Sequence, residues 1–411
     1  MVTVFLLFWS IQYLLIPLSL IINDSILFLD YTMLDLMVDD HGLESFYSYS
    51  SFAVSSIFLS FFFLGIFSVK VEEGKKYILK EKTITLFSQE INILFAIGMF
   101  LALLAFASVF IYASQFGGIE RAILVADTVR SGHGDEVWIS KKFIFVYRFI
   151  PFSILSIIIF FLLDGYKSFW VWLMLWMGVG VAIFSRFTLF KSKQAIIELL
   201  LLYLFYLSQK NKKSYMPHFV MFFFATIFII PALETYLDTG KFVMDVQNIL
   251  QAVLDMLSFF NFDQTSLEFA INKEYDFVYF EGFLSGMRGN LVPFSWMSSM
   301  DNNTIYTNTY FFYAREESIV PPGIVAFGYY NLGILGVVVV AFFSGFMMRK
   351  VEVFFESVIR SSSRFIILYA YILTKVFTWV RTGIPKFTFY STILIVLSLI
   401  IIISYRHEES T

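Results

Sequence analysis

The sequence predicts an all-α fold: a polytopic integral membrane protein with about ten transmembrane helices and one large extracytoplasmic loop. Hydrophobic residues make up 58% of the 411 residues, and charged residues only 15%. Soluble domains, by contrast, are roughly 45–50% apolar. The mean hydropathy is +0.76, and the charged residues gather between long apolar runs. This combination is typical of membrane proteins.

The apolar runs define the predicted spans. A helix needs roughly 20 apolar residues to cross a hydrocarbon core of about 30 Å, because each residue rises about 1.5 Å. The first run lacks a preceding basic segment and a small-residue cleavage site, so we interpret it as a retained span. We treat 1–411 as a single membrane domain. The predicted spans are 3–22, 51–69, 91–113, 143–163, 168–185, 194–209, 217–234, 323–347, 365–380 and 387–404.

Lysine and arginine in the short connections predict sidedness, because cytoplasmic loops are enriched in both. Basic residues gather at 70–82, 210–213 and 349–364. These connections share one side if both termini are cytoplasmic. The acidic segment 23–50, which has no Lys or Arg, then lies outside. The basic connection around Arg186 is the exception, since it would also lie outside.

The largest segment between spans is 235–322, which this topology places outside the membrane. It mixes aromatic and acidic residues, as in DMLSFFNFDQTSLEFAINKEYDFVYFEGF. Residues 245–260 have helical apolar spacing. A helix lying on the membrane surface is the expected structure there.

Charged residues in or beside the spans are candidates for function, because burying a charge in a membrane is costly. Arg148 and Lys375 are as well explained by side chains that reach the membrane surface. For Arg186 and Glu198 we favour a functional role.

Arginines in the predicted outside segments form a second set of candidates. The guanidinium fork binds phosphate through parallel charge-assisted hydrogen bonds. A lipid diphosphate lies at the headgroup level, where these side chains also fall. Solvated loop charge is the simpler explanation for any one arginine, but four arginines in two largely acidic segments favour a site. They are Arg121, Arg130, Arg288 and Arg315.

Several kinds of site are excluded or disfavoured. The chain has no cysteine, which excludes disulfides, thiolate metal sites and a cysteine nucleophile. No phosphate-binding glycine loop, zinc-protease motif or carboxylate pair for a nucleotide-sugar metal is present, so we predict neither a metal nor a cofactor. The net charge of −3 offers no basic surface for nucleic acid. His133 is the one histidine in an outside loop beside the arginines.

Four motifs together carry a family resemblance. They are FGGIERAILVADTVRSG with ten residues between Arg121 and Gly132, the pair Ser185-Arg186 between two spans, NLVPFSW, and PPGIVAFGYYNLGILG entering a span. This pattern resembles the Wzy-type O-antigen and capsule polymerases, the oligosaccharide repeat unit polymerases. A second arginine–glycine spacing of this kind, expected in the large loop, is absent for Arg288 and Arg315.

The resemblance implies a glycosyltransferase of the bacterial plasma (inner) membrane. It would transfer a growing glycan from undecaprenyl diphosphate to a new lipid-linked repeat unit on the outer face. Membrane lipids, a chain-length regulator and a flippase are the implied partners. Arg121, Arg186 and Arg288 would stabilise the leaving diphosphate, and a carboxylate, Glu316, Glu317 or Glu281, would deprotonate the acceptor hydroxyl. The expected substrate-binding residues are Arg130, Arg315, Tyr330 and Asn331.

Two other functions remain open from the sequence. An O-antigen ligase has a similar span count and a large outer loop. Ligases resemble one another in having a loop histidine near the catalytic arginines, and none occurs between 219 and 406. A lipid-oligosaccharide flippase is the non-enzyme alternative, but the long loop 235–322 is unlike the short loops of that class.

Overall fold

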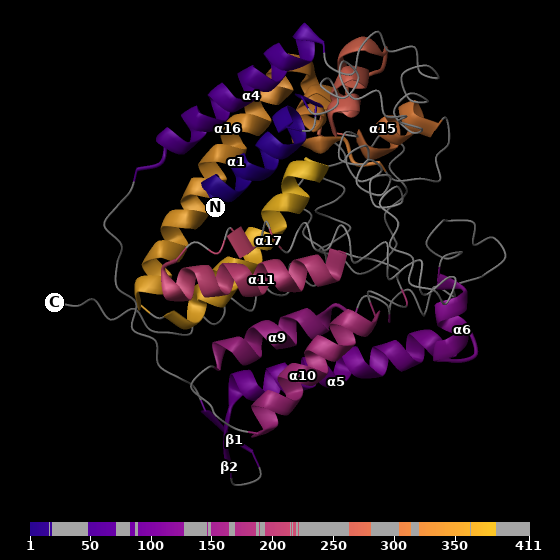
Figure 1. Cartoon of the computed structure of the whole chain (residues 1–411), viewed down its shortest axis with the longest axis vertical. Coiled ribbons are helices and arrows are strands. Elements are labelled where there is room, and N and C mark those ends of the chain that lie inside the picture. The colour runs from indigo at the N-terminus through magenta and orange to yellow at the C-terminus, as the bar shows by residue number, and fades with distance from the viewer. Residues whose placement is uncertain are drawn as a thin grey trace.

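The computed structural model describes parts of the chain that are mostly helical (Figure 1). The described residues are 1–15, 17–18, 48–70, 83–86, 89–126, 146, 149–163, 169–185, 189, 194–213, 215, 217–218, 221, 263–280, 304–313, 320–361 and 363–383. The elements are α1 (Val2–Ser10), η1 (Ile11–Leu15), α4 (Tyr49–Phe67), β1 (Thr83–Leu86), β2 (Gln89–Asn92), α5 (Ile93–Ser114), α6 (Ile119–Leu124), α9 (Phe152–Leu162), α10 (Phe169–Phe184), α11 (Gln194–Asn211), α15 (Thr304–Tyr313), α16 (Gly323–Ser361), η5 (Ser363–Phe365) and α17 (Ile366–Thr382).

Three helices in the described part are long and apolar enough to cross a membrane: Tyr49–Phe67, Leu94–Ser114 and Gly323–Arg360. They overlap the predicted spans 51–69, 91–113 and 323–347, so each of these spans contains helix suited to a bilayer, and the third is broken near its start. This property is expected of a membrane-embedded protein.

The remaining predicted spans have mixed outcomes. Shorter apolar helices occupy Val2–Leu15, Phe152–Leu162, Phe169–Phe184 and Leu199–Ser208. Helix α17 occupies the predicted span 365–380. The predicted span 217–234 lies almost wholly outside the described residues, and 387–404 lies entirely outside them. The total of ten spans therefore stays a prediction.

A short β-hairpin is an exception to the all-α prediction in the described part of the chain. Strands β1 and β2 pair antiparallel, with Thr83 opposite Asn92 and Leu86 opposite Gln89. The hairpin lies directly before α5. Residues 91 and 92 therefore belong to a strand, and the helix predicted from residue 91 begins at Ile93.

The helices pack as two groups joined by α11 (Figure 1). In the first group α4 lies along α16, and α1 and α17 pack against them. In the second group α5, α9 and α10 contact one another, while α11 lies against α17 and also contacts α10. Phe5 of α1 stacks on Phe62 of α4 with ring centroids 4.3 Å apart, which shows how aromatic side chains fill the first group.

The first group has two chemically different ends. At one end, which we call the loop end, lie Tyr13, Ser48, Gly323 and Gly383, because Gly323 packs on Tyr13 and Gly383 packs on Phe327. The opposite end, the lysine end, carries Met1, Lys70, Lys350 and Tyr369, where the Met1 amino group lies 2.8 Å from Tyr369 Oη. The described helix 263–272 of the large loop packs at the loop end.

Helix α16 is broken sharply near its start. Leu332 (φ −150°, ψ 29°) and Gly333 (φ 59°, ψ −142°) are not helical, so the first part of α16 leads through a turn into the long part. A Cβ on Gly328 would lie 2.8 Å from the Cα of Val337, and one on Gly336 would clash with the Gly328 carbonyl oxygen. Only glycine lets the two parts approach this closely. The motif FGYYNLGILG thus forms a turn between helices.

Candidate functional site

Helix 263–272 brings the large loop onto the start of α4. The backbone N–H and the hydroxyl of Ser48 donate to the two carboxylate oxygens of Glu268, at 2.7 and 2.9 Å. Gln264 Nε2 donates to Ser51 Oγ at 3.0 Å. Ser48 also caps α4, since its Oγ accepts from Ser51 N–H. The Glu268 carboxylate therefore lies at a helix N-terminus, where negative charge is favourable.

Asp263, at the start of the described part of this helix, is buried against η1 and α16. Its exposed fraction is 2%. A Cβ on Gly323 would lie 2.9 Å from Asp263 Cβ and would clash with Tyr13 Oη, and Gly323 has φ +75°. The Tyr13 hydroxyl accepts from Val325 N–H at 3.4 Å. Glycine at position 323 is therefore what allows the start of α16, Tyr13 and Asp263 to meet.

A half-buried cation lies close enough to act on Asp263. Burial raises the pKa of the Asp263 carboxyl from 3.8 to about 8, and the positive charge of Arg381 at the end of α17 only partly offsets this effect. Asp263 Oδ2 has no hydrogen-bond partner in the described part of the chain. An acid that titrates near neutral pH beside a cation is typical of a functional site.

Further polar atoms near this pair are buried without a described partner. They include the Trp9 indole N–H, both amide atoms of Gln12, and Gln264 Oε1. Residues three and four apart share a helix face, so Trp9, Gln12 and Tyr13 lie on one side of α1 and η1. Each unsatisfied buried group costs about 1–3 kcal/mol, and such groups mark places where a ligand or water binds. We call Gln12, Tyr13, Asp263, Gln264 and Arg381 the loop-end polar cluster.

The described residues do not assemble a metal site. No group of three or more His, Asp or Glu side chains within these ranges could hold a metal ion. The loop-end polar cluster instead offers one carboxyl group, one guanidinium and neutral hydrogen-bonding groups. That set can accept a proton, neutralise an anion and orient hydroxyl groups.

Most residues predicted as catalytic or substrate-binding lie outside the described part of the chain: Arg186, Arg288 and Glu316 of the first set and Arg130 and Arg315 of the second, together with the alternative bases Glu281 and Glu317. Their predicted roles stay predictions. Arg121 is exposed on the short helix α6, which contacts α5 in the second group of helices. Gly117 and Gly118 precede it with φ of +90° and +124°, so the predicted Gly-Gly motif forms the turn into α6.

Tyr330 and Asn331, predicted to bind substrate, are both fully buried at 0% exposure. The Tyr330 hydroxyl donates to Asn308 Oδ1 at 3.0 Å. Asn331 Nδ2 donates to the Phe327 carbonyl oxygen at 2.7 Å, and its Oδ1 accepts from Phe280 N–H. Both side chains thus hold the turn of α16 to the large loop. A contact with sugar stays a prediction for either residue.

Backbone hydrogen bonds tie the same turn to the loop. Val278 N–H donates to the Tyr330 carbonyl oxygen at 3.1 Å, and Tyr279 N–H donates to that of Asn331 at 3.3 Å. These bonds satisfy carbonyl groups that the end of the first part of α16 would otherwise leave unpaired. The motif predicted from the sequence therefore lies at a junction between the membrane helices and the large loop.

Other charged residues singled out from the sequence are only partly described. Lys375 Nζ lies 4.9 Å from the centroid of the Tyr371 ring, one turn away on α17, and the role of this lysine stays a prediction. The backbone of Glu198 lies in α11. Arg148 and His133 lie outside the described residues.

The sequence analysis did not single out Asp263 or Arg381. Asp263 stands in FNFDQTSLEFA, a stretch in which Leu267 and Ala270 follow at helical spacing. Arg381 follows the last residue of the predicted span 365–380. An acidic residue at the start of an amphipathic helix and a basic residue at the end of a span could each have been recognised as candidates from the sequence. Nothing in either stretch showed that they meet.

Comparison of the chain with protein-family models, with curated proteins and with solved structures gives no match. The resemblance to the repeat unit polymerases therefore rests on the sequence motifs.

Proposed function

We propose that the chain polymerises undecaprenyl-diphosphate-linked oligosaccharide repeat units into O-antigen or capsular polysaccharide. In this proposal it spans the bacterial plasma membrane about ten times, with both termini in the cytoplasm and the loop end outside. The observation that carries the proposal is the loop-end polar cluster, in which a helix of the large loop holds buried Asp263 near Arg381.

The proposed reaction needs an acid–base group and a cation together. The bond between the anomeric carbon and the diphosphate oxygen breaks, and its electron pair goes to the diphosphate. A new bond forms from the anomeric carbon to the acceptor hydroxyl oxygen, whose proton passes to a carboxylate. A fixed cation stabilises the negative charge that develops on the leaving diphosphate.

Asp263 has the chemistry of the proton acceptor. A general base works best when its pKa lies near the working pH, and the pKa of Asp263 is raised to about 8. Arg381 supplies positive charge at the same end of the bundle. The unpartnered amide atoms of Gln12 and the unpartnered Oε1 of Gln264 are suited to sugar hydroxyls, which both donate and accept hydrogen bonds.

The arginines predicted from the sequence keep their roles in this proposal. Arg121, Arg186 and Arg288 would hold the donor diphosphate, with Arg130 and Arg315 beside them. Glu316 stays the sequence-based alternative to Asp263 as the base. The FGYYNLGILG motif is the most specific part of the resemblance. Its position at the junction between the large loop and a membrane helix is consistent with the resemblance and supports the proposal.

The test is the surface glycan of a deletion strain that carries variant copies of the chain. A polymerase loss leaves single repeat units on the acceptor. A ligase loss leaves long unattached polymer, and a flippase loss leaves neither. Long unattached polymer or no product in the deletion strain contradicts the proposal.

Asp263→Asn should reduce chain extension by about 100-fold or more, the lower range for a general base, while the protein stays in the membrane. Asp276→Asn is the matched control, since Asp276 is an exposed acid in the same described segment. Asp263→Glu, which keeps a carboxyl group, should retain part of the activity. Full-length polymer from Asp263→Asn would remove Asp263 from the mechanism and leave Glu316 as the candidate.

A further inference from the structure

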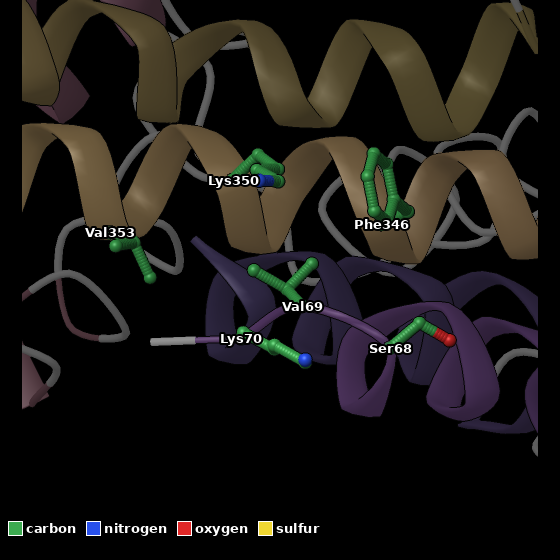
Figure 2. A pocket seen from close by; sticks show the side chains of 6 residues that line it. All are labelled: Ser68, Val69, Lys70, Phe346, Lys350 and Val353. Carbon is green, nitrogen blue, oxygen red and sulfur yellow. The ribbon is translucent and has the colours of Figure 1, made fainter. Parts of the chain in front are cut away.

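A second candidate site lies at the lysine end, away from the loop-end polar cluster. A hollow of about 380 Å³ opens where α4 ends beside α16 (Figure 2). The described residues that line it are Ser68, Val69, Lys70, Phe346, Lys350 and Val353. The two lysines come from different segments: Lys70 lies just after the end of α4, and Lys350 lies within α16.

Close helix packing brings these two lysines to one place. A Cβ on Gly65 would clash with the Phe342 carbonyl oxygen and lie 2.9 Å from Phe346 N. A Cβ on Gly345 would clash with the Phe62 carbonyl oxygen and lie 3.2 Å from Ile66 N. Glycines that let backbones touch are typical of helix pairs in membranes. The close packing of α4 on α16 therefore fixes how far apart the two sides of the hollow lie.

The hollow is cationic. No acidic residue occurs among the described residues that line it. The nearby acids of α16 are engaged elsewhere, since Arg349 Nη1 lies 2.6 Å from Glu352 and 3.9 Å from Glu356. The two lysine ammonium groups therefore present positive charge to a ligand.

An apolar face leads along both helices to the lysines. On α16 the exposed side chains of Leu335 and Phe343 lie on the same helix face as Lys350 by their spacing. On α4 Leu64 and Phe67, near its end, are among the exposed side chains, the latter 79% exposed. In a helix long enough to span a bilayer, such side chains face lipid tails. Charge at the end of an apolar face is the arrangement that matches a phospholipid.

We propose that this hollow binds the phosphate headgroup of an anionic membrane phospholipid, with the acyl chains along the exposed faces of α4 and α16. Lysine recognises phosphate as a point charge. Basic residues beside a span attract anionic lipids of the cytoplasmic leaflet. The site is independent of the proposed reaction, because it lies at the opposite end of the helices.

The test uses the full-length protein in nanodiscs and measures bound phosphatidylglycerol by native mass spectrometry, with phosphatidylcholine as the zwitterionic comparison. Lys70→Gln/Lys350→Gln should lower phosphatidylglycerol binding roughly 30-fold, from about 1 kcal/mol per lysine near an anionic lipid surface. Lys70→Arg/Lys350→Arg, which keeps both charges, should bind as the unmodified protein does.

The matched control is Lys212→Gln/Lys213→Gln, which removes the same charge from two exposed lysines after α11. An equal loss in this control would show general charge attraction and overturn the site. Equal binding of the two lipids, or unchanged binding in Lys70→Gln/Lys350→Gln, would also overturn it. Displacement of the lipid by millimolar inorganic phosphate would show that free phosphate, and not a lipid, is the ligand.

Discussion

At the loop end of the α4–α16 pair, a separate segment of chain supplies buried polar and charged side chains, whereas at the lysine end the two helices meet through glycine and the lysines stay outside. Asp263 is 2% exposed, and Glu268 and Gln264 are 0% exposed. At the other end Lys70 and Lys350 are exposed. Hydrogen bonds to buried polar and charged side chains therefore stabilise these helices at the loop end, whereas close backbone packing at glycines holds them together at the lysine end.

This difference has consequences for what each end can do. Electrostatic interactions are strong where water is excluded and weak where it is present. Buried groups at the loop end can shift their proton affinity and stabilise developing charge. Exposed lysines at the lysine end are suited to attracting a mobile anionic partner. The two proposals accordingly place the chemistry at the loop end and lipid binding at the lysine end.

The largest expected effect is on the pH dependence of stability. The Asp263 pKa is raised from 3.8 to about 8, so the folded protein holds this proton more tightly than the unfolded chain does. The stabilisation by protonated Asp263 is complete below about pH 4 and is lost as pH rises toward 8, at up to about 1.4 kcal/mol per pH unit. Thermal unfolding followed by tryptophan fluorescence in detergent measures it.

Asp263→Asn cannot titrate and should flatten this part of the profile. Lys350→Gln, at the other end, should keep the full pH dependence. Parallel profiles for Asp263→Asn and the unmodified protein would mean that burial at the loop end does not control this carboxyl group.

The second effect tests packing by shape at the lysine end. Gly65→Ala places a methyl group against the Phe342 carbonyl oxygen and should destabilise the protein by about 1–3 kcal/mol through overpacking. Gly180→Ala is the control, because a Cβ there meets nothing within 4 Å. If the two variants melt at the same temperature, the α4–α16 crossing is looser than described.

The smallest effect separates a structural role from a binding role at the turn of α16. Tyr330→Phe removes the hydroxyl that donates to Asn308 and should cost about 1 kcal/mol of stability, with the Michaelis constant for the lipid-linked acceptor unchanged. Tyr310→Phe is the control, since Tyr310 is 59% exposed. An increase in that constant without loss of stability would favour the predicted substrate-binding role of Tyr330.

The sequence predicted the helices at 51–69, 91–113 and 323–347 because hydrophobic length is a local property. It did not predict the break at Leu332 and Gly333, where apolar sequence continues on both sides. It did not predict the β1–β2 hairpin beside the predicted basic connection 70–82 either, since two short strands carry little apolar pattern.

For the candidate site, the sequence identified residue types that suit phosphate but could not place them together. It assigned Asn331 to sugar because the residue is polar and lies beside aromatic residues, and the structure shows both its amide atoms bonded to protein. Burial depends on neighbours from other parts of the chain, which one stretch of sequence does not contain.

The sequence by itself determined that this chain is rich in apolar helices, where its charged connections lie, and which motif resembles a known family. These properties follow from residues close together in the chain. Only the tertiary structure decided that Asp263 packs beside Tyr13 within reach of the charge of Arg381, and that Lys70 and Lys350 line one hollow. Both arrangements depend on the glycines at 65, 323 and 345, where the absence of a side chain lets distant segments approach. The approach of these segments sets the charge and the exposure to water at each end.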